Sequence, residues 1–291
     1  MRAYEFTVYS TNSITCGKPV TALVVAPDEV SSDTGGMMFI HGWGGNRFQH
    51  RDKMEITAEE RNLVCVSAEF RQSGYMADPV KGSGFDLPYD LSFMQTFDVL
   101  NAFRHALSLY PALDRRRLYA YGGSQGGHIA LLAASVFAPG TFCGVYASCA
   151  LVRVPETRAL SAGRVFAPWE HSARDVIEHA GRFRCPILLE HGTADETVDF
   201  SEHALALRRR LTELGRPPVV RWYEGGMHSL EPTITKLEAY KALSPELFAC
   251  PPRGDVDDFA AGRFVSAPCA GRALEIDWSK PVDAADLFAW R

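Results

Sequence analysis

The chain has 291 residues with a formal net charge of −5, and it is 46% hydrophobic and 22% charged. A chain of this length and composition can bury a full core, which excludes the disordered, collagen-like and coiled-coil classes. Its mildly negative charge argues against nucleic acid or an anionic membrane as the main partner.

The cysteines and the N-terminal segment indicate a reducing compartment. The seven cysteines form no Cys-x-x-Cys pair, so we expect neither a zinc knuckle nor a thioredoxin-type motif. The segment from Met1 to Thr15 has one arginine and lacks the apolar core of a signal peptide. No apolar run approaches the ~20 residues of a membrane span. We therefore expect a cytoplasmic protein with no membrane partner.

Short apolar runs predict eight strands. The runs from Met37 onward are mostly continuous, as in strands covered on both faces of a parallel sheet. No helical pattern separates the first two runs, so we expect them to form an antiparallel hairpin at one edge. The eight predicted strands are Glu5–Tyr9, Val20–Val25, Met37–Ile40, Leu63–Ala68, Leu118–Tyr121, Gly144–Ala147, Ile187–Glu190 and Val219–Tyr223.

The third predicted strand runs into a glycine-rich loop. This loop reads His41-Gly42-Trp43-Gly44-Gly45. A loop after an early strand can supply a backbone N–H to an oxyanion hole, and the N–H of Trp43 is the natural donor. In that interpretation His41 and Gly42 shape the loop. A plain tight turn is the alternative.

Amphipathic patterns between the runs predict helices. Apolar residues recur at three- and four-residue steps from Phe93 to Leu107 and again from Phe200 to Leu214. Asp199 or Ser201 is an acceptable N-cap for the second pattern, and His203 lies off its apolar stripe, so we expect this histidine to face solvent. Strands that alternate with helices predict an α/β fold with a mostly parallel sheet.

The segment after the fifth strand predicts a nucleophile. Gly122, Ser124 and Gly126 form Gly-x-Ser-x-Gly between an apolar strand and a small-residue helical pattern. A nucleophile on such a turn has a strained backbone and needs neighbours without bulk. The N–H of Gln125, at a helix N-terminus, is the second expected oxyanion donor. The alternatives are a simple glycine-rich turn or a phosphate nest.

A serine nucleophile needs a base, and the base needs an orienting acid. On this turn the chain order is Ser, then Asp or Glu, then His. Asp195 follows the seventh predicted strand and is preferred over its rivals Glu196 and Asp199, although a turn or N-cap role is the alternative. His228 follows the last predicted strand, and an exposed loop histidine is its alternative reading.

Two regions interrupt the alternation of strands and helices. Residues 151–184 form an excursion that we interpret as a surface loop or as a cap over a pocket. Residues 244–291 are rich in Pro and Asp and show no clear period. We therefore expect a main domain over residues 1–243 and a C-terminal extension over 244–291 that packs on it, as a dimer contact or as a covering flap.

Together these motifs resemble the α/β-hydrolase superfamily from about Ala22 to Leu243. The Gly-Gly-Ser-Gln-Gly-Gly turn and the preceding Asp98 and Asp114-Arg115 stretch are similar to the acetyl xylan esterase/cephalosporin deacetylase group and to prolyl-oligopeptidase-like hydrolases. The deacetylase motif Arg-Gly-Gln appears only as Arg71-Gln72, and dienelactone hydrolases carry Cys where this chain has Ser124.

The resemblance implies an α/β-hydrolase fold and a triad of Ser124, Asp195 and His228, with oxyanion donors at Trp43 and Gln125. It implies neither a metal nor an organic cofactor. We expect hydrolysis of a small-molecule carboxylic ester with a small to medium acyl group. A peptidase, amidase or acyltransferase would use the same triad, and a non-catalytic binding module is the third hypothesis.

The sequence says less about the substrate and about assembly. Aromatic residues could line an apolar pocket, and arginines of the excursion could meet an acidic group or simply be solvated. A homo-oligomer is left open. The residues concerned are Trp43, Tyr75, Phe166, Trp169, Arg153, Arg158 and Arg164.

Overall fold

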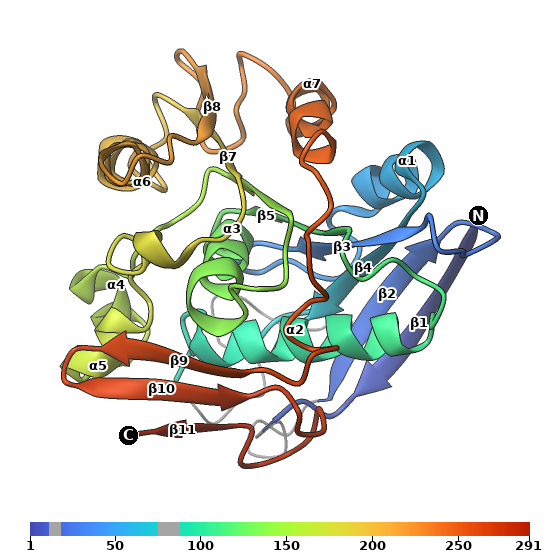
Figure 1. Cartoon of the computed structure of the whole chain (residues 1–291). Coiled ribbons are helices and arrows are strands. Elements are labelled where there is room, and N and C mark those ends of the chain that lie inside the picture. The colour runs from blue at the N-terminus through green and yellow to red at the C-terminus, as the bar shows by residue number, and fades with distance from the viewer. Residues whose placement is uncertain (12–18, 75–87) are drawn as a thin grey trace.

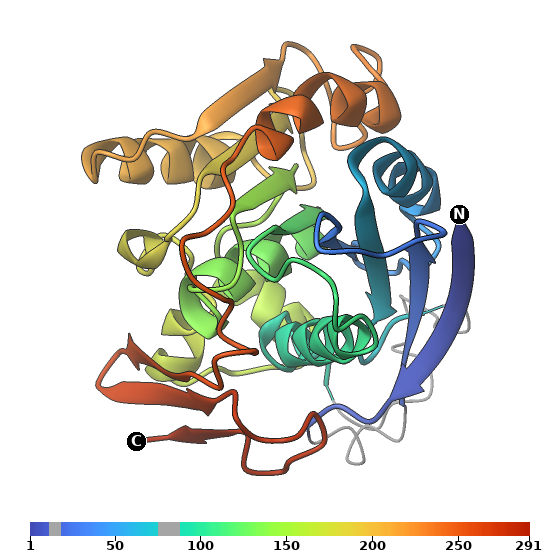
Figure 2. The same cartoon turned by 45° about the vertical axis from the view of Figure 1, so that its right-hand side comes forward.

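The protein is described from a computed structural model, which describes residues 1–11, 19–74 and 88–291. Tyr75, which was named above, and Cys16, one of the seven cysteines, lie outside the described residues. Figures 1 and 2 show a central sheet with helices on both faces and a second, smaller sheet near the C-terminus.

The central sheet has eight strands in the order β1-β2-β4-β3-β5-β6-β7-β8. Strand β1 pairs antiparallel with β2, and β2 pairs antiparallel with β4, whereas every later neighbour pair is parallel. The predicted strands and the predicted edge hairpin are therefore confirmed. The strands are β1 Arg2–Val8, β2 Val20–Ala26, β3 Gly35–Ile40, β4 Leu63–Glu69, β5 Leu118–Gly123, β6 Gly144–Ser148, β7 Ile187–Gly192 and β8 Val219–Tyr223.

Helices cover both faces of this sheet (Figure 2). Helices α1 and α7 pack on one face, and α2, α3 and α6 pack on the other, where the larger part of the core lies. The helices are α1 Arg51–Arg61, α2 Phe93–Ser108, α3 Gln125–Leu132, η2 Ala133–Phe137, α4 Glu156–Ser161, α5 Pro168–Ser172, η3 Ala180–Arg182, η4 Ser201–Leu205, α6 Ala206–Glu213 and α7 Lys236–Phe248.

Helix α2 is buried between the two sheets. The apolar stripe predicted from Phe93 to Leu107 faces the core, as expected. Phe97 stacks on Phe288 with ring centroids 4.7 Å apart, and Phe93 stacks on Trp290 at 5.6 Å. The C-terminal segment therefore covers the side of α2 that the main sheet leaves open, as Figure 1 shows.

The C-terminal extension is where the prediction was incomplete. It forms an antiparallel sheet of β9 Phe264–Cys269, β10 Arg272–Asp277 and β11 Phe288–Trp290, where no regular structure was predicted. In β9 the buried positions are Val265, Ala267 and Cys269, and exposed residues include Pro268, so the alternation is carried by small side chains with weak hydrophobic contrast. The predicted boundary between residues 243 and 244 lies inside α7.

No helix in the described parts of the chain is both long and apolar enough to cross a membrane. The six cysteines that the structure describes are all free thiols, and five of them are buried. They therefore act as small apolar core residues.

Candidate active site

Ser124 lies at the junction of β5 and α3 in a strained conformation. Its backbone has φ 56° and ψ −123°, a left-handed φ that residues other than glycine seldom adopt. The turn is so tight that a Cβ on Gly122 would lie 2.1 Å from the carbonyl oxygen of Gly126. Only glycine fits there, so the predicted Gly-x-Ser-x-Gly turn has the strand–turn–helix geometry that exposes the serine hydroxyl.

The loop after β3 lies beside this serine. A Cβ added to Gly42 would lie 3.4 Å from the Cβ of Ser124, and one added to Gly126 would lie 2.1 Å from the carbonyl oxygen of Ile40. The two segments that carry the predicted oxyanion donors, Trp43 and Gln125, are therefore adjacent. In the described parts of the chain neither amide donates a hydrogen bond to another backbone carbonyl outside the helices and strands, and Gln125 is the first residue of α3.

The structure brings together Asp195 and His228, which are far apart in the sequence. His228 Nδ1 donates a hydrogen bond to Asp195 Oδ2 at 2.8 Å. The side chain of Asp195 is fully buried, while that of His228 is 27% exposed. This pairing leaves the Nε2 of His228 as the ring nitrogen that can accept a proton, which is the tautomer a general base requires.

Asp195 is held as an anion by several donors. Its Oδ1 accepts the backbone N–H groups of Thr197 and Val198, each at 2.9 Å. Burial opposes ionisation, but the hydrogen bonds from His191, His228 and Val198 outweigh it and hold the pKa of Asp195 below its usual range. The carboxylate thus stays charged and fixed in orientation opposite His228.

Backbone contacts between the loops after β7 and β8 set this pair in position. Ala194 N donates to Gly226 O at 3.0 Å, and Thr193 N donates to Tyr223 O at 3.0 Å. A Cβ on Gly192 would lie 2.1 Å from Gly226 O, so glycine is required where the loops cross. Glycine at position 192 is therefore a structural requirement of the site.

Sequence reasoning missed a further partner of the acid. His191 Nε2 lies 2.8 Å from the carbonyl oxygen of Val198 and 3.1 Å from Asp195 Oδ2. A carbonyl can only accept, so Nε2 carries the proton and His191 donates toward the carboxylate. Its position four residues before the acid, in the strand that leads to it, is the signal that could have identified it.

The same region contains the group best suited by residue type to hold a metal. The ligand atoms of Cys149, His191 and Asp195 lie within 4.8 Å of one another. However, the protonated Nε2 of His191 is a donor, and burial raises the pKa of the Cys149 thiol to about 12. A protonated thiol and an imidazole N–H are not ligands, so the contacts fit support for the carboxylate and do not fit metal binding.

The rival acids lie elsewhere. Glu196 is exposed, and Asp199 Oδ1 accepts the backbone N–H of Glu202 at 2.8 Å, so its carboxylate satisfies one N–H group in the first turn of η4. The expectation for His203 was wrong. It is buried and its Nδ1 accepts the N–H of Val152 at 3.2 Å, because residues 151–154 fold back over the start of this helix.

The nucleophile–base contact itself stays a prediction. Within the described ranges no hydrogen bond joins Ser124 Oγ to His228. Two backbone hydrogen bonds hold the surrounding segments together: Ser124 N donates to Ser148 O at 2.8 Å, and Cys149 N donates to Glu190 O at 2.9 Å. These bonds link the serine turn to β6, and β6 to β7. Catalytic hydrogen bonds are often long before substrate binds, and a serine hydroxyl can rotate toward its base.

An aromatic side chain links the side chains of the two residues whose backbone N–H groups are the expected oxyanion donors. Trp43 stacks on Tyr89 with ring centroids 5.1 Å apart, and the Tyr89 hydroxyl donates to Gln125 Oε1 at 2.8 Å. The guanidinium of Arg158 lies over the Trp43 ring at 5.6 Å. Tyr89 follows no recognisable motif, and the excursion brings Arg158 here through tertiary packing alone.

The other residues considered for a substrate pocket are engaged elsewhere. Phe166 is buried under the guanidinium of Arg174 at 4.0 Å, and Trp169 lies under Arg272 at 4.1 Å. Arg164 lies 3.8 Å from Glu170, and Arg153 lines a different recess. Of the seven residues named for the pocket, Trp43 and Arg158 are the described ones that meet beside the serine turn.

Comparisons with known proteins identify the family and the fold. The model of the prolyl oligopeptidase family, Peptidase_S9, matches residues 92–244, which is more than half of the chain and includes Ser124, Asp195 and His228. A search of curated protein sequences gives no significant match.

Solved structures show the same fold. An acylaminoacyl peptidase of Pyrococcus horikoshii matches with a TM-score of 0.68 and 15% identity, over 87% of this chain and 42% of its own. A puromycin-hydrolyzing peptidase of Mycobacterium tuberculosis gives 0.66 and 21%, over 87% and 40%. A thermophilic esterase of Thermogutta terrifontis, solved with butyrate bound, gives 0.64 and 17%, over 87% and 96%. This chain thus spans about two fifths of the length of the peptidases that it matches, and the predicted α/β-hydrolase fold is confirmed.

Proposed function

Since the chain belongs to the prolyl oligopeptidase family of α/β-hydrolases, we propose that it is a serine hydrolase that cleaves carboxylic esters with a small to medium acyl group. The 2.8 Å hydrogen bond between His228 Nδ1 and buried Asp195, at the same sheet edge as the strained Ser124, carries the proposal. It is the arrangement that turns a serine hydroxyl into a nucleophile.

In the first half of the reaction Ser124 Oγ attacks the ester carbonyl. His228 Nε2 takes the hydroxyl proton, and Asp195 stabilises the resulting imidazolium through Nδ1–H. The carbonyl oxygen becomes an oxyanion that accepts hydrogen bonds from the N–H groups of Trp43 and Gln125. The tetrahedral intermediate then expels the alkoxide, which takes the proton from His228 and leaves as an alcohol.

In the second half water replaces the alcohol. His228 removes a proton from the water as it attacks the acyl carbon, and the oxyanion forms in the same place. The intermediate breaks the bond to Ser124 Oγ, which recovers its proton from His228, and a carboxylic acid leaves. One protonatable group therefore serves both steps, first as base and then as acid.

Support for an ester substrate comes from the extent of the structural matches. The thermophilic esterase aligns over 96% of its own length, whereas the acylaminoacyl peptidase aligns over 42% of its own. The matched region thus corresponds to a whole esterase and to part of a peptidase.

A peptidase or amidase is the second candidate, because the family match and the peptidase structures favour it directly. The two functions differ in the leaving group, and an acyltransferase would differ in the acceptor that replaces water. Relative kcat/KM values on nitrophenyl acetate, nitrophenyl butyrate and aminoacyl nitroanilides separate the first two. We expect the esters to be turned over faster, and a clear preference for the anilides would overturn the ester proposal.

The triad itself is tested with Ser124→Ala. We expect turnover of nitrophenyl acetate to fall by about 10⁴-fold or more with the fold retained, because the nucleophile is lost. Ser108→Ala is a matched control, since Ser108 is exposed on α2 and its hydroxyl donates to the carbonyl of His105 in the same helix. Unchanged turnover by Ser124→Ala would overturn the triad assignment.

A further inference from the structure

A recess lined by arginines lies at the opposite end of β7 from Asp195. Arg184 precedes the first residue of this strand, whereas Asp195 follows its last residue. The recess has a volume of about 410 Å³. Its lining includes four guanidinium groups and one carboxylate, from Arg182, Arg184, Arg216, Arg263 and Asp258.

The charges in this recess do not balance. Arg263 is paired with Asp258 at 3.4 Å and also with Asp255. By contrast, in the described parts of the chain no carboxylate oxygen lies within 4.0 Å of a guanidinium nitrogen of Arg182, Arg184 or Arg216. Half-buried Arg182 and the exposed Arg184 and Arg216 therefore line one recess with no carboxylate partner among the residues that the structure describes.

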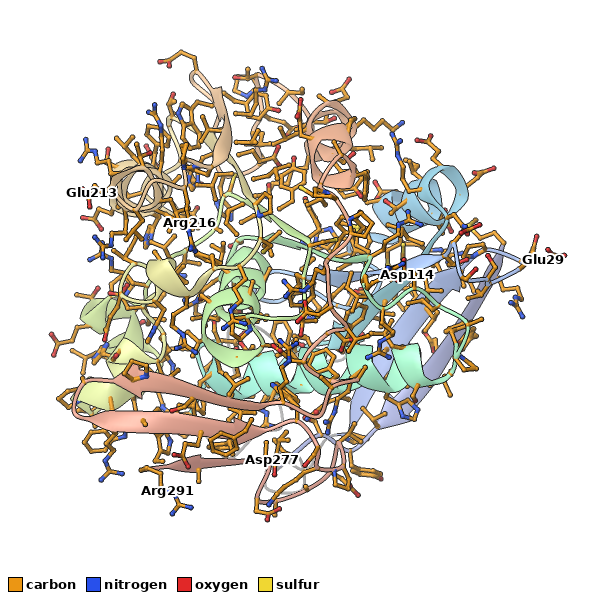
Figure 3. The ribbon with its side chains drawn as sticks, viewed as in Figure 1. Glu29, Asp114, Glu213, Arg216, Asp277 and Arg291 are labelled. Atoms are coloured by element: carbon orange, nitrogen blue, oxygen red, sulfur yellow. The ribbon has the colours of Figure 1, made fainter. Side chains whose placement is uncertain are left out.

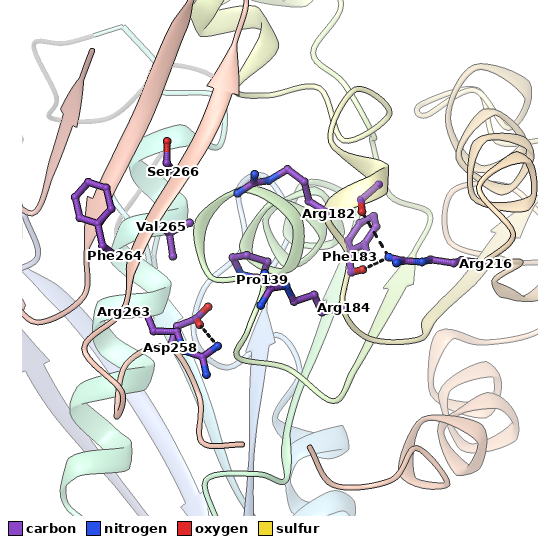
Figure 4. A pocket seen from close by; sticks show the side chains of 11 residues that line it. Pro139, Arg182, Phe183, Arg184, Arg216, Asp258, Arg263, Phe264, Val265 and Ser266 are labelled. Carbon is purple, nitrogen blue, oxygen red and sulfur yellow. Dashed lines mark hydrogen bonds and ion pairs between the residues drawn. The ribbon is translucent and has the colours of Figure 1, made fainter. Parts of the chain in front are cut away.

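Two of these arginines, Arg182 and Arg216, are oriented by neutral groups. Arg182 Nε donates to the carbonyl oxygen of Ser135 at 2.8 Å, and Arg216 Nη1 donates to that of Phe183 at 2.5 Å. In Figure 4, Arg182 and Arg184 reach toward the space bounded by Pro139 and Val265, and Arg216 approaches from the other side of Phe183. Arg216, labelled in Figure 3, comes from the segment that follows α6. Carbonyl contacts orient Arg182 and Arg216 but leave their charge uncompensated.

The half-buried guanidinium of Arg182 has an electrostatic cost that an anion would relieve. Burial lowers the pKa of Arg182, and the neighbouring charge of Arg184 acts in the same direction. An oxyanion placed between these groups removes the repulsion and accepts charge-assisted hydrogen bonds, which guanidinium groups form with carboxylate and phosphate in a bidentate manner.

An apolar recess continues from the basic one. It has a volume of about 520 Å³ and shares Phe183, Arg184 and Arg216 with the first. Its other walls are apolar for the most part and include Ile187 and Leu211. A ligand with an anionic head on the arginines could therefore place an apolar tail against these side chains without leaving the surface of the protein.

We propose that the two recesses together bind an amphiphilic anion, with a phosphate or carboxylate head on Arg182, Arg184 and Arg216 and a short apolar tail against Ile187 and Leu211. The site uses none of the groups assigned to ester hydrolysis. It lies at the amino-terminal edge of the sheet, so it does not depend on the proposed function.

Calorimetric titration of the full chain with octyl phosphate, below its critical micelle concentration, tests the site. We expect saturable binding that is at least about tenfold tighter than that of inorganic phosphate, because the tail adds apolar burial. Octanoate should bind as well, whereas octyl glucoside, which has the tail without the charge, should not. Equal affinity for octyl glucoside and octyl phosphate would overturn the role of the arginines, and equal affinity for inorganic phosphate would overturn the role of the tail.

Variants locate the binding. Arg182→Gln/Arg184→Gln should weaken octyl phosphate binding by at least about tenfold, because it removes two of the charged donors. Arg209→Gln, on the exposed side of α6, removes one charge outside both recesses and should change the affinity by less than about twofold. Ser124→Ala should bind as the wild type does. Full affinity in the double variant, or loss of binding in Ser124→Ala, would overturn the proposal.

Discussion

Two buried carboxyl groups at the end of β7 have opposite environments. Asp195, in the loop after the strand, accepts hydrogen bonds from two imidazole groups and two backbone N–H groups. Glu190, within the strand, is 1% exposed, and its Oε2 accepts a hydrogen bond from the Tyr146 hydroxyl at 2.5 Å. Its Oε1 has no hydrogen-bond partner among the described residues, although the hydroxyl of Ser148 lies near the carboxyl group.

The difference in donors gives the two acids opposite pKa shifts. Burial raises the pKa of Glu190, and the hydroxyls of Ser148 and Tyr146 and the charges of Lys236 and Lys53 only partly oppose it. Burial acts in the same direction on Asp195 but is outweighed. Hydrogen-bond donors therefore decide which of these two buried carboxyl groups is a fixed anion able to orient a histidine.

The largest effect should come from removing the charge of the orienting acid. Asp195→Asn should lower kcat on nitrophenyl acetate by about 10³- to 10⁴-fold, because an amide no longer stabilises the imidazolium or fixes its tautomer. Steady-state kinetics, with circular dichroism to verify the fold, measures this loss.

Glu190→Gln is the matched control, since it makes the same chemical change in the neighbouring buried acid. It should leave kcat within about threefold of the wild type, because Glu190 contacts none of the proposed catalytic groups. Similar losses in the two variants would remove the distinction between the two carboxyl groups.

The next effect concerns stability at Glu190. Tyr146→Phe removes the hydroxyl that donates to Oε2 and should lower the free energy of unfolding by about 1–3 kcal/mol, because a buried acceptor loses its partner. Urea denaturation measures it. Tyr110→Phe, which removes a half-buried hydroxyl bonded to Tyr4, should cost less than about 1 kcal/mol. Equal losses in the two variants would mean that the hydrogen bond to Glu190 adds nothing to the free energy of unfolding.

A smaller effect is expected from the second imidazole on Asp195. His191→Asn should lower kcat by about tenfold with KM nearly unchanged, because the carboxylate loses one of its donors and is held less firmly. His203→Asn perturbs another buried histidine, whose Nδ1 accepts the N–H of Val152, and should reduce stability while kcat is kept. A parallel loss of kcat in both variants would reduce His191 to a packing role.

The sequence predicted the fold well where each signal was local. Continuous apolar runs marked β3 to β7, and Gly122 and Gly126 predicted a turn whose geometry they alone permit. The Asp195–His228 contact was predicted because the order of motifs along the chain implies a common sheet edge. These signals can be read from the sequence without knowing the tertiary contacts between elements.

The remaining features depend on tertiary contacts. Tyr89 reaches Gln125 from a segment without a motif, and β9 alternates small residues that carry little hydrophobic contrast. His203 is polar at a position off the helical stripe, and only the return of residues 151–154 buries it. Helical periodicity predicts which face of a helix packs on one surface. It does not predict that a second segment covers another face of the same helix.

The smallest predicted effect is on the pH dependence of stability. The contributions of the two acids to this dependence have opposite signs. A carboxyl group with a lowered folded pKa stabilises the protein above its unfolded pKa, and this stability is lost as pH falls through the folded pKa. Asp195 is of this kind.

For Glu190, whose pKa is raised, the contribution to stability is fully present below the unfolded pKa of about 4.3 and is lost as pH rises through the folded pKa. Glu190→Gln cannot ionise. The free energy of unfolding of this variant relative to wild type should therefore rise between pH 4 and neutral pH. Urea denaturation across this range measures the difference, and a gap that closes as pH rises would mean that Glu190 is a stabilised anion like Asp195.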